Sequence, residues 1–121
     1  MDEKLYNLDS LYKLLNQDAE EVQEMVHMFI EIAPATLSEM EEAYDEENFE
    51  ELGKLAHKFK GNLRLLNIHS LEDTILNLEK YSKENRNLDE IKRLMDKLET
   101  TLPQVIEQLK ANELQNAERS K

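Results

Sequence analysis

His57 stands among neighbours whose types and spacing could support chemistry on its imidazole ring. Lys60 follows three residues later, Gly61 follows four residues later, and Gly53 precedes the histidine by four residues. On a helix, residues three or four positions apart share a face, so an ammonium and two positions without side chains would flank the ring. A neutral imidazole is a nucleophile, and a nearby ammonium balances negative charge placed on its nitrogen. The pattern indicates phosphoryl transfer to a histidine nitrogen.

Gly61 is the more unusual of these neighbours. Glycine inside a helix costs about 1 kcal/mol relative to alanine, so its presence needs a reason. A missing Cβ one turn after His57 would clear space for another molecule to approach the ring. Because phosphoryl transfer depends mainly on positioning and electrostatics, an exposed and well-held imidazole can suffice on one side of the reaction. Spacing alone leaves open that the glycine serves close helix packing instead.

The segment around His57 has a charge opposite to that of the whole chain. The protein carries 27 acidic residues and a net charge of −12, yet none of these acids lies within residues 52–71. This segment contains the residues that we call the basic surface: Lys54, Lys58, Lys60 and Arg64. We expect Lys60 to reach a group placed on His57, and the other three to attract an acidic partner. A simple solvated face would show the same pattern, so partner docking is a hypothesis at this point.

Composition and charge limit the other possibilities. A net charge of −12 disfavours binding to nucleic acid or to anionic membranes, because their phosphates repel an acidic surface. The chain has no cysteine, which excludes disulfides and thiolate metal sites and fits a reducing compartment. No signal peptide is recognisable, and no run approaches the ~20 apolar residues that span a membrane. We expect a cytoplasmic protein that forms one domain over residues 1–121.

Apolar residues at helical spacing predict the elements that position His57. The chain has only two glycines and two prolines, so it offers little material for hairpin turns. A short helix is expected within residues 5–15, and longer helices should follow it, with bends at Pro34 and Pro103. The helix that carries His57 should span about residues 48–66 and end at Asn67, a residue that tolerates left-handed backbone. Residues 112–121 lose the apolar stripe and are expected to fray.

Three capping-box patterns mark where other helices should start. The second, fourth and fifth helices are expected to begin at these pairs: Asp18 with Glu21, Ser70 with Asp73, and Asn87 with Glu90. Amphipathic helices joined by short turns bury their stripes most simply as an antiparallel four-helix bundle. We therefore predict an all-α fold, with the short N-terminal helix added at one end and a core over about residues 5–110. His57 should project away from the apolar stripe of its own helix.

The run Leu55-Ala56-His57-Lys58-Phe59-Lys60-Gly61-Asn62 resembles the signature of histidine-containing phosphotransfer (HPt) domains. The resemblance extends over about residues 5–110. It implies that His57 is phosphorylated, that Lys60 contacts the phosphoryl group and that Gly61 leaves the ring accessible. Two positions depart from the family pattern: Asn62 stands where serine or alanine is commoner, and Asn67 where glycine usually ends the helix.

The resemblance also implies partners and a place in signalling. The phosphoryl group would come from the aspartate of a response regulator receiver domain and move through His57 to another receiver, with a hybrid sensor kinase as a further partner. Lys54, Lys58 and Arg64 would serve docking. The chain would be a monomeric phosphoryl carrier without an enzyme's own catalytic machinery. It would need no cofactor, because the partner receiver supplies magnesium.

Three alternatives remain at this level. A non-catalytic helical adaptor that docks a partner through its basic face shares every fold-level feature. A di-metal bundle needs two inward-facing Glu-x-x-His motifs, and the chain has one, Glu24 to His27, which is expected to face solvent. In a histidine kinase dimerisation pair, an acidic residue usually follows the histidine, whereas Lys58 stands here. His69 is expected to lie in a turn between two helices.

Overall fold

The computed structural model describes residues 4–114, and these form helices and connecting turns with no strand. The α-helices are α1 (Asp9–Leu14), α2 (Ala19–Asp45), α3 (Phe49–Leu65), α4 (Glu72–Glu84) and α5 (Leu88–Leu109). A 3₁₀ turn, η1 (His69–Leu71), precedes α4, and a π-helical turn, η2 (Lys110–Leu114), follows α5. The all-α prediction is confirmed.

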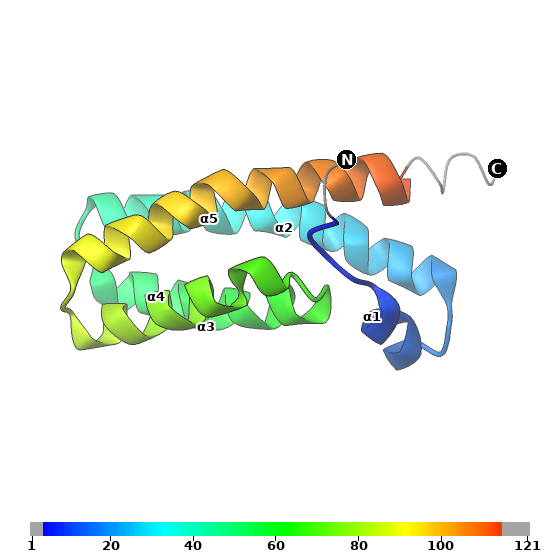
Figure 1. The fold of residues 1–121 in the computed structure, drawn as a ribbon, viewed down its shortest axis with the longest axis horizontal. Helices are drawn as coiled ribbons and strands as arrows, with labels where there is room; N and C mark the ends of the chain where they lie inside the picture. Colours follow the sequence, from blue (N-terminus) through cyan, green and yellow to red (C-terminus); the bar gives the residue numbers. More distant parts are fainter. Residues whose placement is uncertain (1–3, 115–121) are drawn as a thin grey trace.

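The four longer helices form the predicted bundle. Figure 1 shows α2 and α5 side by side along the top of the molecule, with α3 and α4 below them. Neighbouring helices in the chain contact one another, α5 returns to contact α2, and the most extensive contact joins α3 to α4. The short α1 lies against α2 at one end of the bundle, where the sequence places it. The tight α3–α4 pair is the part of the fold that carries His57.

The apolar stripe of α3 fixes which way its other face points. The stripe is buried: Leu52, Leu55, Phe59 and Leu63 within α3, and Leu66 directly after it. Phe59 stacks on Phe29 of α2, with ring centroids 6.1 Å apart. Burying a large apolar side chain stabilises the fold by about 1.5–3 kcal/mol, so rotating α3 about its axis would be costly. The opposite face of α3 is therefore held toward solvent.

Side-chain caps define the starts of α2 and α3. Asp18 precedes α2 and accepts hydrogen bonds from the backbone N–H groups of Glu20 and Glu21. Asn48 precedes α3 and accepts one from the N–H of Glu51 at 3.2 Å. These bonds satisfy amide groups that have no partner inside the helix. The expected start of α2 at Asp18 is confirmed, and α3 begins one residue after Asn48.

The other two expected caps make no capping hydrogen bond, although the start of α5 at Asn87 is confirmed. Ser70 lies inside the 3₁₀ turn, α4 begins only at Glu72, and the Ser70 hydroxyl oxygen is buried with no hydrogen-bond partner among residues 4–114. Asn87 precedes α5 as expected but has left-handed backbone (φ 61°), and its side chain makes no capping bond. A capping side chain needs extended backbone to reach the first turn, which neither residue has. Asn67 is left-handed at φ 49°, as predicted.

The N-terminal segment ties α5 to the rest of the molecule. The Leu5 N–H donates to the Gln108 side chain at 2.8 Å, and the Tyr6 hydroxyl donates to Glu113 at 2.6 Å. Burial, together with that hydrogen bond, raises the pKa of Tyr6. The tail expected to fray begins at residue 112, but residues 112–114 are helical. Residues 115–121 lie outside the described residues.

Pro34 and Pro103 lie inside α2 and α5, and both helices continue through them; the expected bends stay predictions. None of the described helices is long and apolar enough to cross a membrane.

Candidate functional site

His57 projects from the middle of α3 toward solvent. Its side chain is 63% exposed, whereas Ala56 and Phe59 beside it are fully buried. The buried neighbours hold the backbone of α3 in place, so the imidazole is presented on a rigid element. The predicted orientation of His57 is confirmed.

A carboxylate from α4 holds the imidazole ring. Glu79 is only 8% exposed, and its Oε2 atom lies 2.6 Å from Nδ1 of His57. An ionised carboxylate can only accept hydrogen bonds, so Nδ1 carries the proton and donates it. The other ring nitrogen, Nε2, then has the free lone pair of the neutral imidazole. Glu79 thereby selects the tautomer and orients the ring.

Two lysines keep this carboxylate charged. Nζ of Lys60 donates to Oε1 of Glu79 at 3.0 Å, and Nζ of Lys83 donates to Oε2 at 3.1 Å. Burial raises the pKa of Glu79, but the hydrogen bonds from Lys60, Lys83 and His57 outweigh it and lower that pKa to about 2. At neutral pH the site therefore contains one carboxylate and two ammonium groups. The imidazole shares an acceptor oxygen with one of those ammonium groups.

Lys60 has a partner that the sequence did not predict. It lies on the same side of α3 as His57, but its ammonium contacts Glu79 and its side chain is only 21% exposed. Lys60 and the His57 ring therefore contact the same carboxylate, that of Glu79. In this arrangement Lys60 stabilises the acceptor that orients His57, while its remaining N–H donors stay available to an anion.

The two glycines of α3 have different surroundings. A Cβ built at Gly61 would meet no atom within 4 Å, so the space beside it is open, as the access argument requires. A Cβ at Gly53 would lie 3.4 Å from Cβ of Ser82 and 3.5 Å from Cγ of Lys83. Gly53 therefore lies in the contact between α3 and α4, and of the two glycines only Gly61 leaves open space beside the site.

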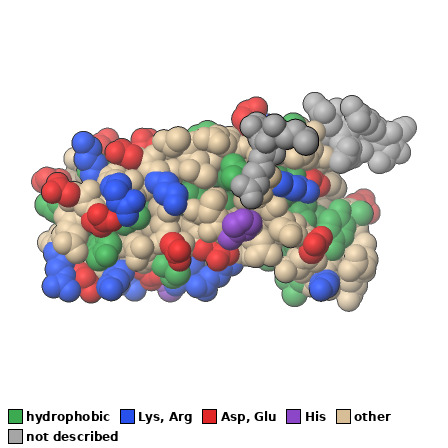
Figure 2. Space-filling view, viewed as in Figure 1, with side chains coloured by type: hydrophobic (Ala, Val, Ile, Leu, Met, Phe, Trp, Pro, Cys, Tyr) green, Lys and Arg blue, Asp and Glu red, His purple; other side chains and the backbone are tan. Residues whose placement is uncertain are grey.

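The rest of the basic surface is solvent-exposed. Lys54, Lys58 and Arg64 are exposed along α3, and Lys54 forms an ion pair with Glu50 at 3.6 Å. Figure 2 shows Lys and Arg side chains recurring along the lower edge of the molecule, over α3 and α4. Residues 52–71 contain no acidic residue, but the folded surface that they form does include one. The neighbouring helix α4 brings Glu79 into the middle of the basic surface.

Sequence reasoning missed Glu79 and Lys83. A signal was present, since Glu79 follows directly after Leu78 and lies one turn after Ile75, both of which are buried apolar positions of α4. An acidic residue on the buried side of an amphipathic helix calls for a partner. Lys83 stands four residues later, where it can pair with Glu79 on the same helix. The partner across the helix pair could not be identified without knowing the register of α3 against α4.

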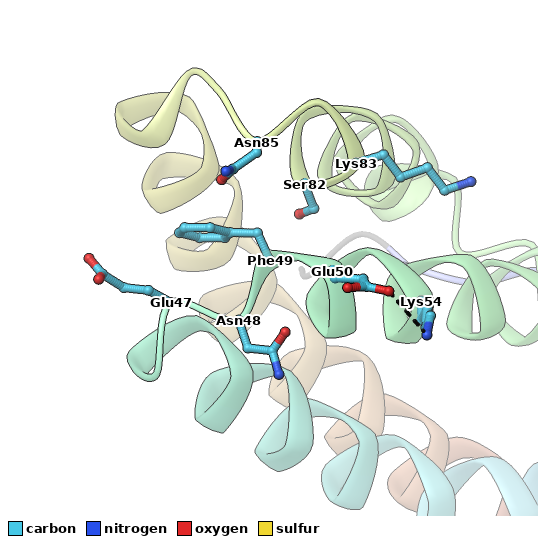
Figure 3. Close-up of a pocket in the computed structure, with 8 residues that line it drawn as sticks. All are labelled: Glu47, Asn48, Phe49, Glu50, Lys54, Ser82, Lys83 and Asn85. Atoms are coloured by element: carbon cyan, nitrogen blue, oxygen red, sulfur yellow. Dashed lines mark ion pairs between the residues drawn. The ribbon is translucent and has the colours of Figure 1, made fainter.

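A groove lies beside the site but does not contain it. It has a volume of about 540 Å³ and lies between the start of α3 and the end of α4, where Phe49, Ser82 and Asn85 line it. Figure 3 shows the Lys83 side chain extending away from Phe49 and Asn85, on the side of the groove where Lys54 lies. His57 itself stands on an open surface, which suits a reaction with another macromolecule.

The other histidines are placed as expected. His27 and Glu24 are exposed on α2, so the single Glu-x-x-His motif faces away from the bundle interior. His69 lies in the 3₁₀ turn, and its Nδ1 is 3.2 Å from the backbone oxygen of Asn67. Within residues 4–114, no group of three or more histidine or acidic side chains is arranged to hold a metal ion.

In a comparison with known protein families, the model of the Hpt domain matches residues 24–118. The match covers most of α2 and all of α3 to α5, and it includes His57, Lys60, Gly61 and Glu79. Searches of curated proteins and of solved structures give no match. A helical bundle that presents a rigidly held imidazole on an open surface agrees with this result. The chain belongs to the Hpt domain family, the phosphocarrier modules of two-component phosphorelays.

Proposed function

We propose that this protein accepts a phosphoryl group on His57 from the aspartate of one receiver domain and passes it to the aspartate of another. The observation that carries the proposal is the 2.6 Å hydrogen bond between Nδ1 of His57 and the ionised Glu79. It leaves Nε2 as the nucleophilic nitrogen on a side chain that is 63% exposed. The open space beside Gly61 lets a partner approach that nitrogen.

The transfer step follows from this tautomer. The Nε2 lone pair attacks phosphorus, the N–P bond forms, and the P–O bond to the donor aspartate breaks as that aspartate leaves as a carboxylate. The ring becomes positively charged while its Nδ1 proton stays hydrogen-bonded to Glu79. This contact stabilises the charged ring, so the carboxylate favours the phosphorylated product as well as the correct tautomer. The same step in reverse delivers the group to a second receiver and restores the neutral ring.

The chain contributes position and charge to this reaction, and the receiver contributes the rest. Phosphoryl transfer has little covalent chemistry for a protein to perform beyond holding the nucleophile and balancing charge. The magnesium ion such chemistry uses would be supplied by the receiver. Lys54, Lys58 and Arg64 would attract the acidic phosphorylation site of that receiver, and Lys60 would contact the phosphoryl group. We therefore regard the protein as a carrier rather than an enzyme.

Incubation with a receiver domain carrying radiolabelled aspartyl phosphate tests the proposal. The protein should become labelled in a form that is stable to base and labile to acid, as phosphohistidine is. The variant His57→Gln should take up no label while its helicity stays almost unchanged, because glutamine has no ring nitrogen to phosphorylate but keeps an amide N–H group that can donate to Glu79. His27→Gln and His69→Gln are the matched controls and should be labelled normally.

Two results would contradict the assignment. Label that persists in His57→Gln, or that disappears in either control, would place the phosphoryl group elsewhere. Binding of the receiver without any label would indicate that the protein is a non-catalytic adaptor that uses its basic face only for docking.

A further inference from the structure

We infer that a contact between two small residues, Gly53 of α3 and Ser82 of α4, sets the spacing at which Glu79 can reach the imidazole ring. The inference rests on the proposed phosphorylation of His57, and it makes Gly53 and Ser82 positioning residues for that reaction. A Cβ built at Gly53 would lie 3.4 Å from Cβ of Ser82 and 3.7 Å from the backbone oxygen of Glu79. Figure 3 shows the Ser82 side chain pointing from α4 toward the start of α3. The backbone of α3 therefore lies directly against the turn of α4 that carries Glu79.

Glu79 reaches the ring only because the two helices are this close. Gly53 and His57 are one turn apart on the same face of α3, so the spacing at the glycine also governs the spacing at the ring. Oε2 of Glu79 lies 2.6 Å from Nδ1 of His57. A separation of about 3.6 Å no longer makes a hydrogen bond, so moving α4 outward by roughly 1 Å would release the imidazole.

A branched side chain at position 53 would force that movement. The distance between two packed helices depends on the side chains at their contact. A single Cβ at this position makes ordinary contacts, whereas the γ-carbons of valine would reach about 1.5 Å farther toward α4. A helix restricts valine almost entirely to one rotamer, so these carbons cannot swing away. Gly53→Val should therefore push α4, and Glu79 with it, away from His57.

The contact uses the small size of Ser82 and not its hydroxyl group. Ser82 is 2% exposed, and its Oγ atom has no hydrogen-bond partner within residues 4–114. A buried hydroxyl without a partner destabilises a protein. Ser82→Ala removes that hydroxyl and keeps the close contact with Gly53, so this variant should melt at a higher temperature and hold the His57 ring as before.

The test reads the ring directly, by ¹⁵N NMR of the neutral imidazole of His57. The intact protein, Gly53→Ala and Ser82→Ala should each show a single tautomer, with the proton on Nδ1. Gly53→Val should exchange between both tautomers, because the carboxylate no longer selects one. Combining Gly53→Val with Ser82→Gly moves volume across the contact and should restore the single tautomer. Leu109→Ala is the stability control: it truncates the buried last residue of α5, so it should lower the melting temperature and leave the tautomer unchanged.

Phosphoramidate then measures the consequence for transfer without any receiver docking. Its P–N bond breaks, ammonia leaves, and the N–P bond to His57 forms. Gly53→Val should slow this reaction several-fold, and the combined variant should recover most of the rate. Three results would refute the spacing role: a single tautomer in Gly53→Val, no recovery in the combined variant, or loss of the single tautomer in Leu109→Ala. An intact protein that holds one tautomer but takes up no phosphoryl group on His57 would instead refute the proposed function and leave the spacing role standing.

Discussion

Glu79 is the residue on which the site depends, although it carries no phosphoryl group itself. Three side chains donate to its two oxygens, and they come from both helices of the tightest pair in the bundle. A buried carboxylate that loses one partner is costly, because the remaining groups no longer compensate for its removal from water. The same carboxylate thus links the stability of the fold to the orientation of the nucleophile.

This link predicts a pH-dependent stability. The pKa of Glu79 is lowered from 4.5 to about 2 in the folded protein, so the ionised group stabilises the fold above pH 4.5 and loses that effect as the pH falls toward 2. Glutamine resembles the protonated acid. Glu79→Gln should therefore lower the free energy of unfolding by roughly 1–3 kcal/mol at neutral pH, and by progressively less below pH 4.5.

Urea unfolding of both proteins across this pH range measures the difference. A gap that stays constant from neutral pH down to pH 2 would show that the carboxylate is not held in its ionised form by its neighbours.

At the scale of elements, α3 is the helix in which stability and access conflict. Its glycine at position 61 faces open space, so Gly61→Ala should stabilise the protein by up to ~1 kcal/mol through helix propensity alone. A long side chain there would instead stand over the approach to His57. Gly61→Gln should fold normally and transfer phosphoryl groups much more slowly.

Thermal melting together with single-turnover transfer from a labelled receiver checks both effects. Gly53→Ala is a useful comparison, because its new methyl group would make ordinary contacts with Ser82 and Lys83 and leave the approach to the ring open. Normal transfer by Gly61→Gln would mean that the glycine is not needed for access.

The sequence predicted these elements well and the contacts between them less well. Apolar spacing was enough for α3, because burial of Leu52 and Phe59 fixes its orientation. The local pattern at Asn87 marked the start of α5 correctly, but the capping bonds expected at Ser70 and Asn87 do not form, because neither residue has the extended backbone that a cap needs. The contact between Glu79 and His57 joins residues 22 positions apart on different helices, so it depends on a helix register that no local pattern contains.

At the scale of the whole molecule, a strongly acidic protein presents a basic surface around one histidine. Such a charge distribution speeds encounter with an acidic partner and discourages approach on the other faces. Exposed charge pairs are individually weak, about 0.2–1 kcal/mol, and physiological salt largely screens charges that are more than roughly 8 Å apart. The outer lysines and arginine should therefore act on association, and Lys60 on the transfer step.

Removing Lys54 or Arg64 should slow transfer from a receiver modestly, and added salt should erase most of that difference. Lys60→Gln should be slower at every salt concentration, because its contact is short and largely shielded from solvent. Single-turnover transfer at low and high salt makes the comparison, with Lys58→Gln as a further surface variant. Equal losses that salt removes in all four variants would reduce Lys60 to one more docking charge.

The hydrogen bond from Tyr6 to Glu113 has a consequence for folding kinetics. It joins residues 107 positions apart, so nearly the whole described chain must be in place before it can form. Contacts that close so large a loop tend to form after the rate-limiting step of folding. Tyr6→Phe, which costs about 1 kcal/mol, should therefore accelerate unfolding roughly fivefold and leave the refolding rate unchanged. Stopped-flow chevron plots would show this, and a slower refolding arm would place the contact in the folding nucleus. A contact between the two ends of the described chain would then control how long the native state persists rather than how quickly it forms.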